Sequence, residues 1–519
     1  MVNLNLFGRG RDAARDPGPD TRNEAGGLAY AFGPEHALAQ LAVTGTFQGT
    51  FYGEGQDQLD AIRRAADGCS PTFLAQTALY ARERGCMKDM PAALCAMLSK
   101  ADLALLDAVF ERVIDNGKML RNFVQLLRSG AFGRRSLGSG PKRLVRRWLA
   151  NRSDAALLRA SVGQQPSLAD VVKMVHPKPD TASRRALYAW LLGREHDAGA
   201  LPEVVRRFEA FKRGETDELP DVDFRLLTAL PLTQAHWVEV ARRGGWTQTR
   251  MNLNAYLRHG VFDAPGLAEA VALKLADPEQ VRRARAFPYQ LYVALQSADD
   301  RLPGVVRGAL EAALELATAN VPSFATQVHV VVDVSGSMSS PVTGHRRGAT
   351  SAVRCVDVAA LVAATVLRRN PGSTVLPVDT AVHADHGLGP QASIAENAAR
   401  LARFGGGGTD LSAALRHLNR ARAQGGLVLI VSDNESWVDS LRGRTGVLEE
   451  FRRYQRRNPG AKLVCLDLQP YGSTQAPDAP DEILNIGGFS DAVFAQIDRF
   501  VRGELSPALW VGEISRIAI

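Results

Sequence analysis

The chain lacks several features that would define its class at once. No stretch approaches the roughly 20 uninterrupted apolar residues of a membrane-spanning helix. The N-terminus has no apolar core long enough for a signal peptide. The five cysteines are scattered, odd in number and without a CxxC pair, which predicts reduced thiols and argues against a disulfide framework or a zinc site. We therefore expect a soluble, cytoplasmic protein.

The length and the charge set further bounds. A chain of 519 residues is too long for one hydrophobic core, so we expect about two to four domains. The formal net charge is +7 and the sequence pI is about 9.2. Such an excess suits an anionic partner, although many ordinary proteins are mildly basic.

The texture of the sequence changes near residue 320. Residues 1–26 are rich in Gly, Pro, Asp and Arg and predict a flexible N-terminal tail. Residues 27–320 carry apolar residues at three- and four-residue spacing, with no convincing strand. So many short helices cannot form one bundle, and stacked helix pairs are the natural solution. We predict a HEAT-like helical-repeat domain, with an irregular all-α domain as the alternative.

Residues 321–505 predict an α/β domain. Apolar strands at 328–332, 373–378, 427–432 and 462–468 alternate with helices. Strands that are apolar throughout are typical of a parallel sheet covered by helices on both faces, as in doubly wound folds. The remaining residues, 506–519, alternate weakly and predict a C-terminal tail that packs on the body, either as an edge strand or as a strap onto the helices.

Three polar segments follow the predicted strands of the α/β domain. Asp333, Ser335 and Ser337 follow the first strand, Thr409 follows a run of four glycines, and Asp433 follows the strand LVLIVS. Ligands bind at the carboxyl edge of such sheets. Two carboxylates and three hydroxyls with room for water favour Mg²⁺ or a similar hard ion.

Each segment also has a simpler explanation. A lone DxSxS turn is common, and aspartates at strand ends often cap helices. The glycine run resembles a phosphate-binding loop, but no GK[ST] follows it. The combination and order of the three segments favour the metal site. No base or nucleophile is paired with the predicted metal, so the site predicts binding and not catalysis.

A second notable stretch lies in the helical part. No acidic residue occurs between Asp115 and Asp154. The same interval holds ten basic residues: Lys118, Arg121, Arg128, Arg134, Arg135, Lys142, Arg143, Arg146, Arg147 and Arg152. A cluster of this kind attracts phosphates and predicts a nucleic-acid-binding face. The alternative is that the arginines pair with acids of neighbouring helices.

Several motifs together resemble a known family. They are GTFY at 49–52, CMKDMP at 86–91, HPKP with His176 and Lys178, FPY at 287–289, and the three metal segments. The metal segments resemble the metal-ion-dependent adhesion site of von Willebrand factor A domains. The order of helical repeats, basic stretch, HPKP and A domain resembles the Ro autoantigen (TROVE-domain) family, in its bacterial branch.

The resemblance implies a monomeric ring of HEAT-like helices closed by the A domain. It implies a non-catalytic scaffold that binds a small noncoding Y RNA on a basic outer face and single-stranded 3′ ends of misfolded RNAs in the central hole. It also implies a role beside exoribonucleases such as polynucleotide phosphorylase. An RNA-binding histidine of the family matches His176. Two basic family positions fall on Arg159 and Gly163, and the second has no charge here.

Two rival functions remain open at this point. In one, the A domain is a metal-dependent docking or adhesion module and the helices bind another protein. In the other, the metal supports a nuclease, which predicts RNA cleavage that depends on Asp333. The absence of a paired base disfavours the nuclease.

Overall fold

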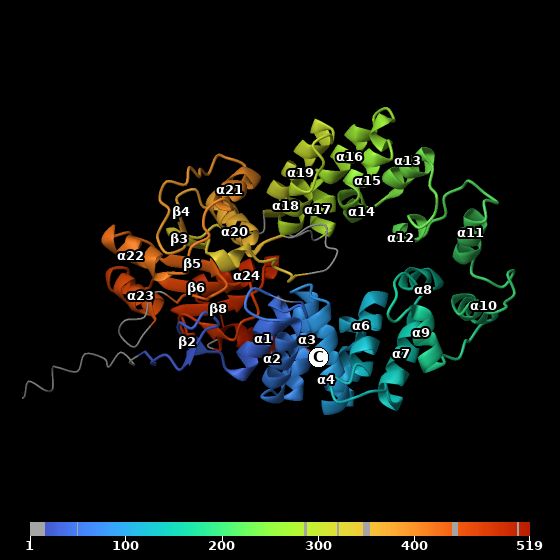
Figure 1. Ribbon diagram of the computed structural model, residues 1–519, viewed down its shortest axis with the longest axis horizontal. Coiled ribbons are helices and arrows are strands. Elements are labelled where there is room, and N and C mark those ends of the chain that lie inside the picture. The colour runs from blue at the N-terminus through green and yellow to red at the C-terminus, as the bar shows by residue number, and fades with distance from the viewer. Residues whose placement is uncertain are drawn as a thin grey trace, which may run out of the picture.

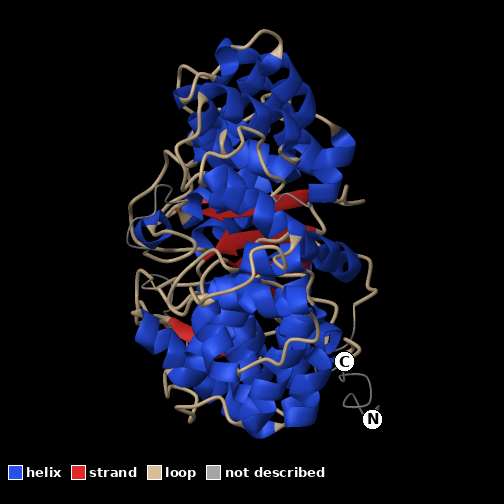
Figure 2. Cartoon of the chain, turned by 90° about the vertical axis from the view of Figure 1, so that its right-hand side faces the viewer, coloured by secondary structure: helices blue, strands red, loops and turns tan. Residues whose placement is uncertain are grey.

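The structure is a computed structural model of the whole chain. It describes residues 16–48, 50–284, 288–318, 321–345, 353–437, 445–505 and 508–519. A long arc of helices leaves one side of an α/β domain and returns to its other side (Figure 1). Seen from the side, the strands lie in the middle of the molecule with helices above and below them (Figure 2).

The arc begins with a tightly packed group of helices. These are α1 (Pro34–Thr44), α2 (Gly55–Asp67), α3 (Pro71–Glu83), α4 (Asp89–Ala101), α5 (Leu103–Val113), α6 (Gly117–Arg128), α7 (Ser139–Asn151), α8 (Asp154–Ala160) and α9 (Leu168–Val175). Side-chain caps define many of the starts. The Ser70 hydroxyl accepts from the amide of Phe73, and Ser167 and Asp170 form a capping box at α9.

The arc continues through shorter helices. These are α10 (Ala182–Leu191), α11 (Glu203–Lys212), α12 (Phe224–Leu227), α13 (Gln234–Arg243), α14 (Trp246–Met251), α15 (Leu253–Arg258), α16 (Leu267–Leu275), α17 (Pro278–Ala284), α18 (Pro288–Gln296) and α19 (Gly304–Ala317). Stacked helix pairs such as α3 with α4 and α16 with α19 make the largest helix–helix contacts. The predicted solenoid-like architecture is confirmed.

The α/β domain, called the A domain below, alternates strands and helices. Its elements are β3 (Val328–Asp333), α20 (Cys355–Arg369), β4 (Thr374–Val378), α21 (Ile394–Leu401), α22 (Ser412–Arg420), β5 (Leu427–Ser432), α23 (Gly446–Arg457), β6 (Lys462–Asp467), β7 (Ser473–Thr474), β8 (Ile483–Gly487) and α24 (Asp491–Val501). The main sheet has the order β4-β3-β5-β6-β8 and is parallel throughout. The predicted fold class is confirmed.

The two faces of this sheet have separate cores. Val330 and Leu429 pack into the large core that continues through the helical arc. Val331 and Ile430 point to the other face and pack beneath α22 and α23. Helices therefore cover both faces, and α22 and α23 lie on the face turned away from the arc (Figure 1).

Both ends of the arc pack on the A domain. Helix α1 contacts β8, and the Gln40 amide donates to the Gln469 carbonyl at 2.9 Å. At the other end α18 contacts α20 and α19 contacts α21, where Glu315 and Arg368 form an ion pair at 3.1 Å. The A domain closes the arc into a ring.

The two ends of the chain differ from expectation. Residues 16–26, which the composition placed in a flexible tail, run along the A domain: β1 (Thr21–Arg22) pairs with β2 (Leu28–Ala31), and β2 pairs with β7. Asp16 forms an ion pair with Arg452 at 2.6 Å. Residues 1–15 lie outside the described part. At the other end only the suggested edge strand is wrong: the tail forms a helix, α25 (Leu509–Ser515), which packs on α1, α3 and β8 and so fits the alternative of a strap onto the helices.

The described residues include no helix that is both long and apolar enough to cross a membrane.

Candidate functional sites

Adjacent parallel strands bring the predicted metal ligands together. Val332 pairs with Val431, so Asp333 and Asp433 leave the sheet at the same edge. The Asp333 carboxylate accepts from the amide of Ser335 at 2.9 Å and from the Ser432 hydroxyl at 2.6 Å. These bonds hold the carboxylate in place at the end of β3.

The glycine loop lies against the same turn. The amide of Gly336 donates to the Gly407 carbonyl at 3.0 Å, and the amide of Gly406 donates to the Val334 carbonyl at 3.1 Å. A Cβ at Gly405 would lie 1.6 Å from the Val334 oxygen, so only glycine permits this approach. The loop delivers Thr409, whose side chain is buried, to the edge that carries the carboxylates.

The hydroxyls complete the predicted set. The Ser335 and Ser337 oxygens lie 3.3 Å apart, and both residues are buried. The structure thus gathers all five predicted ligands at one edge. Among the described residues, no three His, Cys, Asp or Glu side chains meet in a metal-binding group. A cation here would therefore depend on the hydroxyls as much as on the carboxylates.

The electrostatics of this edge suit a cation. Burial raises the pKa of Asp333, and burial together with the Asp333 charge raises that of Asp433. Burial and the Asp433 charge raise the pKa of Glu435 to about 9. Buried carboxylates that repel one another are costly unless a positive charge joins them. The donor set fits a hard divalent ion.

Sequence reasoning missed two residues of this edge. Glu435 is fully buried and accepts from the amide of Ala25 at 3.1 Å, which ties the N-terminal segment to the site. Tyr52 reaches the edge from the loop between α1 and α2, where its hydroxyl interacts with Ser337. Burial and the Asp433 charge raise the Tyr52 pKa to about 12. Only the folded chain reveals Tyr52, whereas the acidic run DNES gave a weak signal for Glu435.

Much of the basic stretch is used inside the protein. Arg121 is buried and donates to the Ala160 carbonyl at 2.6 Å, and Arg134 donates to the Ser99 carbonyl at 2.7 Å. Arg147 pairs with Asp107 at 2.5 Å, and Arg152 pairs with Glu111 at 3.1 Å. The expected uncompensated cluster is wrong for these residues, because acids and carbonyls from other helices neutralise or hold them.

Other predicted contact residues are exposed. Arg135, Arg143, His176 and Lys178 are exposed, and Lys142 is half-buried. Arg159 is exposed, with Asp223 at 3.7 Å. The Arg146 guanidinium donates to the Val175 carbonyl at 2.5 Å, which places α7 beside the HPKP segment. His176 ends α9 with a left-handed φ of 49°.

The backbone conformation and surroundings of Gly163 disfavour a basic side chain at this position. Its φ is 115°, and a Cβ there would lie 2.5 Å from the Arg121 guanidinium. Arg128 of the basic stretch and Lys173, which the sequence analysis did not select, line an open groove between α6 and α9 together with Gln165 and Asp170.

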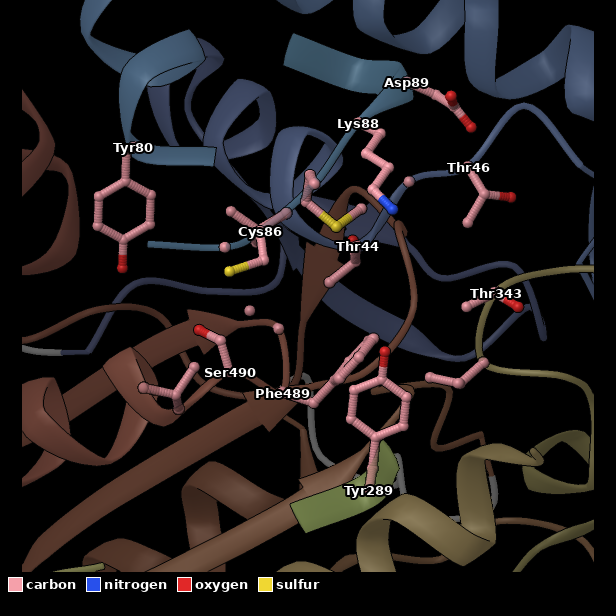
Figure 3. A pocket seen from close by; sticks show the side chains of 18 of the residues that line it. Thr44, Thr46, Tyr80, Cys86, Lys88, Asp89, Tyr289, Thr343, Phe489 and Ser490 are labelled. Atoms are coloured by element: carbon pink, nitrogen blue, oxygen red, sulfur yellow. The ribbon is translucent and has the colours of Figure 1, made fainter. Parts of the chain in front are cut away.

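A pocket lies at the seam between the start of the arc, α18 and the A domain. Its volume is about 350 Å³ (Figure 3). Lys88 extends into it, and Lys118 also lines it, so Lys118 belongs to this seam and not to the α7 face. Burial lowers the Lys88 pKa, and the charges of Lys118 and Arg82 lower it further. The rings of Tyr289 and Phe489 meet edge to face at 5.0 Å on the opposite wall.

Comparisons with known proteins agree with this architecture. Residues 327–501 match the family model of the Ro60 vWA domain. The chain is 27% identical to the RNA-binding protein RO60 of Deinococcus radiodurans, over 93% of this chain and 96% of that protein. The crystal structure of the Deinococcus radiodurans RO (RSR) protein shares the fold, with a TM-score of 0.60 and 21% identity over 91% of this chain and all of that one. The resemblance to the Ro family that the sequence indicated is thereby confirmed, in the A domain and along nearly the whole chain.

Proposed function

We propose that this protein is a non-catalytic RNA-binding scaffold, in line with its similarity to an RNA-binding protein over almost its full length. The observation that carries the proposal is the pair Lys88 and Lys118 in the seam pocket. Burial lowers the pKa of Lys88, and repulsion by the Lys118 charge lowers it further. An anion such as a phosphate would relieve that repulsion.

The seam pocket also suits a nucleobase. Tyr289 and Phe489 provide aromatic surface beside the cations, and stacking on such rings tolerates any base. Asp89 also lines the pocket, and its carboxylate accepts from the Asn122 amide at 2.8 Å. We propose that single-stranded 3′ ends of misfolded or structured RNAs are held here, at the inner seam of the ring.

A structured RNA would bind elsewhere. Arg128 and Lys173 are exposed and line the groove beside Gln165; Arg143 on α7 and Lys178 in the HPKP segment are exposed too. Duplex RNA is held mainly by shape, through phosphates and 2′-hydroxyls. We propose that this surface is the basic outer face that takes a small noncoding Y RNA, with His176 at its edge.

The A domain adds a docking function to the proposal. Asp333, Ser335, Ser337, Thr409 and Asp433 would hold Mg²⁺, which would bring a hard positive charge to this edge for a partner's carboxylate. The proposed partner is an exoribonuclease such as polynucleotide phosphorylase, so that the scaffold presents RNA for processing and decay. The second candidate function is a metal-dependent docking or adhesion protein, favoured by the buried carboxylate edge itself.

The experiment compares a single-stranded RNA with a free 3′ end and the same RNA circularised. Wild-type protein should prefer the linear RNA. Lys88→Ala with Lys118→Ala should weaken that binding about tenfold at moderate salt, because two phosphate contacts are lost. The matched control removes two paired cations, Lys212→Ala with Arg213→Ala, and should change little.

Equal affinities of wild type and the Lys88/Lys118 variant would refute the seam site. No measurable RNA binding by the wild type would refute the scaffold and favour the docking protein. RNA cleavage in Mg²⁺ that Asp333→Ala abolishes would refute the non-catalytic role.

A further inference from the structure

Helices α22 and α23 bring their C-terminal ends together on the sheet face turned away from the ring (Figure 1). The Arg457 guanidinium donates to the Asn419 side chain at 2.6 Å. Asn458, which caps α23, donates to the Ala423 carbonyl at 3.2 Å, in the turn that ends α22. Both helices lead back into parallel strands, so these ends lie at the sheet edge opposite the metal ligands.

Arginines gather on this surface. The α22–α23 arginine face consists of Arg416, Arg420, Arg422, Arg453, Arg456 and Arg457. Asp410 pairs with Arg416, and Glu450 pairs with Arg453 at 3.1 Å. Arg420, Arg422 and Arg456 are exposed and form no ion pair with an acid in the described part of the chain. Arg457 is half-buried and held by Asn419, so three exposed arginines of the face have no acidic partner in the described part of the chain.

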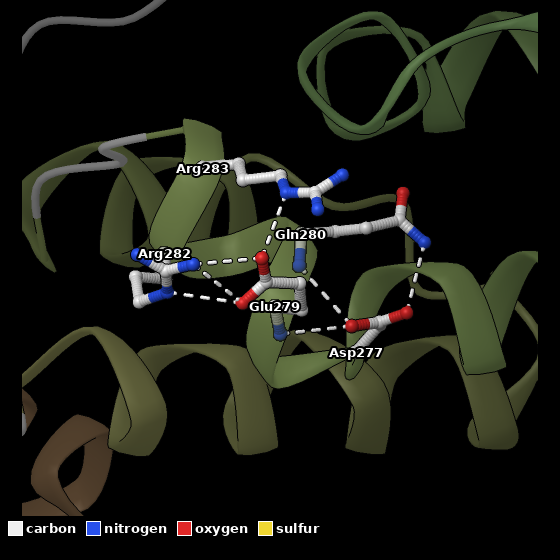
Figure 4. Close-up of polar contacts among 5 residues, drawn as sticks. All are labelled: Asp277, Glu279, Gln280, Arg282 and Arg283. Atoms are coloured by element: carbon white, nitrogen blue, oxygen red, sulfur yellow. Dashed lines mark hydrogen bonds and ion pairs between the residues drawn. The ribbon is translucent and has the colours of Figure 1, made fainter.

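Two other arginine pairs are neutralised by an acid on their own helix. On α17, Glu279 accepts from both Arg282 and Arg283, at 2.7 and 2.8 Å (Figure 4). On α11, Glu203 serves Arg206 and Arg207 in the same way. In each case the acid stands one helical turn before the arginines.

On the α22–α23 arginine face, arginines occupy the positions that acids occupy on α17 and α11. The residue one turn before Arg420 is Arg416, and those one turn before Arg456 are Arg452 and Arg453. Like charges at this spacing destabilise a helix. The helix dipole favours cations in the last turn, which explains their position but not three without an acidic partner. Acids do pair with Arg416, Arg452 and Arg453, but none in the described part of the chain pairs with the three exposed arginines, and such a surface suits a polyanion.

We propose that the α22–α23 arginine face is a second RNA-binding surface, which holds the phosphates of a strand that extends beyond the ring. The inference rests on the proposed function, because it takes RNA to be the polyanion. Arginine forks match phosphate oxygens in bidentate pairs, and Arg420, Arg422 and Arg456 are free to form them. No Phe, Tyr or Trp side chain is exposed on α22 or α23, and phosphate contacts carry no sequence information, so we expect binding independent of base sequence.

The test is the affinity for poly(U) as a function of salt and strand length. The variant is Arg420→Gln, Arg422→Gln and Arg456→Gln. The matched control removes three paired arginines from α11 and its C-cap, by Arg206→Gln, Arg207→Gln and Arg213→Gln. The two variants have the same net charge, so a general charge effect would be equal in both.

For poly(U) of about 40 nucleotides, the face variant should bind about tenfold more weakly, and its salt slope should fall by about 2, as three lost phosphate contacts predict. A strand of about 8 nucleotides, long enough for one binding site, should bind wild type and variant equally. The control should match wild type with both strands.

The outcomes separate the two claims. If the long strand binds the face variant as tightly as wild type, the inference is wrong while the seam site stands. Equal losses in the face and control variants would also overturn it. If neither strand binds wild-type protein, the proposed function itself fails. An acidic protein as the true ligand of this face would appear as unchanged poly(U) affinity.

Discussion

Helix α7 and the seam pocket show two uses of positive charge. Helix α7 is the most conspicuous basic element of the sequence, yet Arg147 pairs with acids of α5 and Arg146 holds the end of α9. Among its described lining residues the seam pocket has two lysines, Lys88 just before α4 and Lys118 on α6; burial lowers the pKa of Lys88, and the charge of Lys118 lowers it further. Whether a basic side chain has an acidic partner in the folded protein therefore says more about phosphate binding than the density of basic residues along the sequence.

Two charge-reversal variants should give the largest effects and test whether the seam pocket and α7 differ. Lys118→Glu places a carboxylate in the seam pocket and should lower single-strand affinity about a hundredfold at low salt, because attraction becomes repulsion. Arg143→Glu makes the same charge change on the exposed side of α7 and should lower it only a fewfold. Fluorescence anisotropy with one labelled oligonucleotide measures both. Equal losses would show that the two regions do not differ.

The metal edge should behave independently of both cationic regions. Mg²⁺ at about a hundred times its dissociation constant should stabilise wild-type protein by about 2.7 kcal/mol. Asp333→Asn should abolish that stabilisation and leave RNA affinity unchanged, since the carboxylate lies in the other domain. Thermal unfolding with and without Mg²⁺ measures the first effect. If neither Mg²⁺ nor Ca²⁺ changes the unfolding temperature of the wild type, the proposed ion site is contradicted.

A lysine at position 163 should not create a phosphate-binding site. Gly163→Lys restores a basic residue at a position where the family has one, but the residue has a φ of 115° and faces the Arg121 guanidinium. We expect a loss of about 2 kcal/mol in unfolding free energy from backbone strain and the clash. Chemical denaturation measures it. A stable variant with increased RNA affinity would contradict this explanation.

The smallest effect should come from the paired arginines. Arg147→Gln and Arg152→Gln remove partly exposed ion pairs with Asp107 and Glu111, which are each worth about 0–1 kcal/mol. RNA affinity should stay within about twofold of wild type, because these cations already have partners. A tenfold loss of RNA affinity would return α7 to the centre of the binding face.

The sequence predicted what depends on local pattern. The apolar runs placed β3 and β5 at their observed positions, and the alternation of strands with helices was also predicted. The five metal-edge residues followed from the same strands, because parallel pairing alone brings strand ends together. The short strand pairing of residues 21–31 and the helix α25 were missed, since contacts with the A domain stabilise them more than their own sequence does.

The rest depended on partners distant in the chain. The sequence around Arg147 does not predict that Asp107 lies beside it. Lys88 is a candidate phosphate-binding residue only because the fold places Lys118 near it. Tyr52 joins the metal edge from the helical part across almost the whole sequence. The packing of neighbouring helices sets the first two of these contacts and the closure of the ring sets the third, and no local pattern encodes either.

The central claim is that a single RNA strand is held at the seam of the ring. The direct test crosslinks a single-stranded RNA carrying 4-thiouridine near its 3′ end to wild-type protein and maps the modified peptides by mass spectrometry. We expect crosslinks in the peptides that contain Tyr289 and Phe489. Crosslinks confined to α7, with none at the seam, would contradict it.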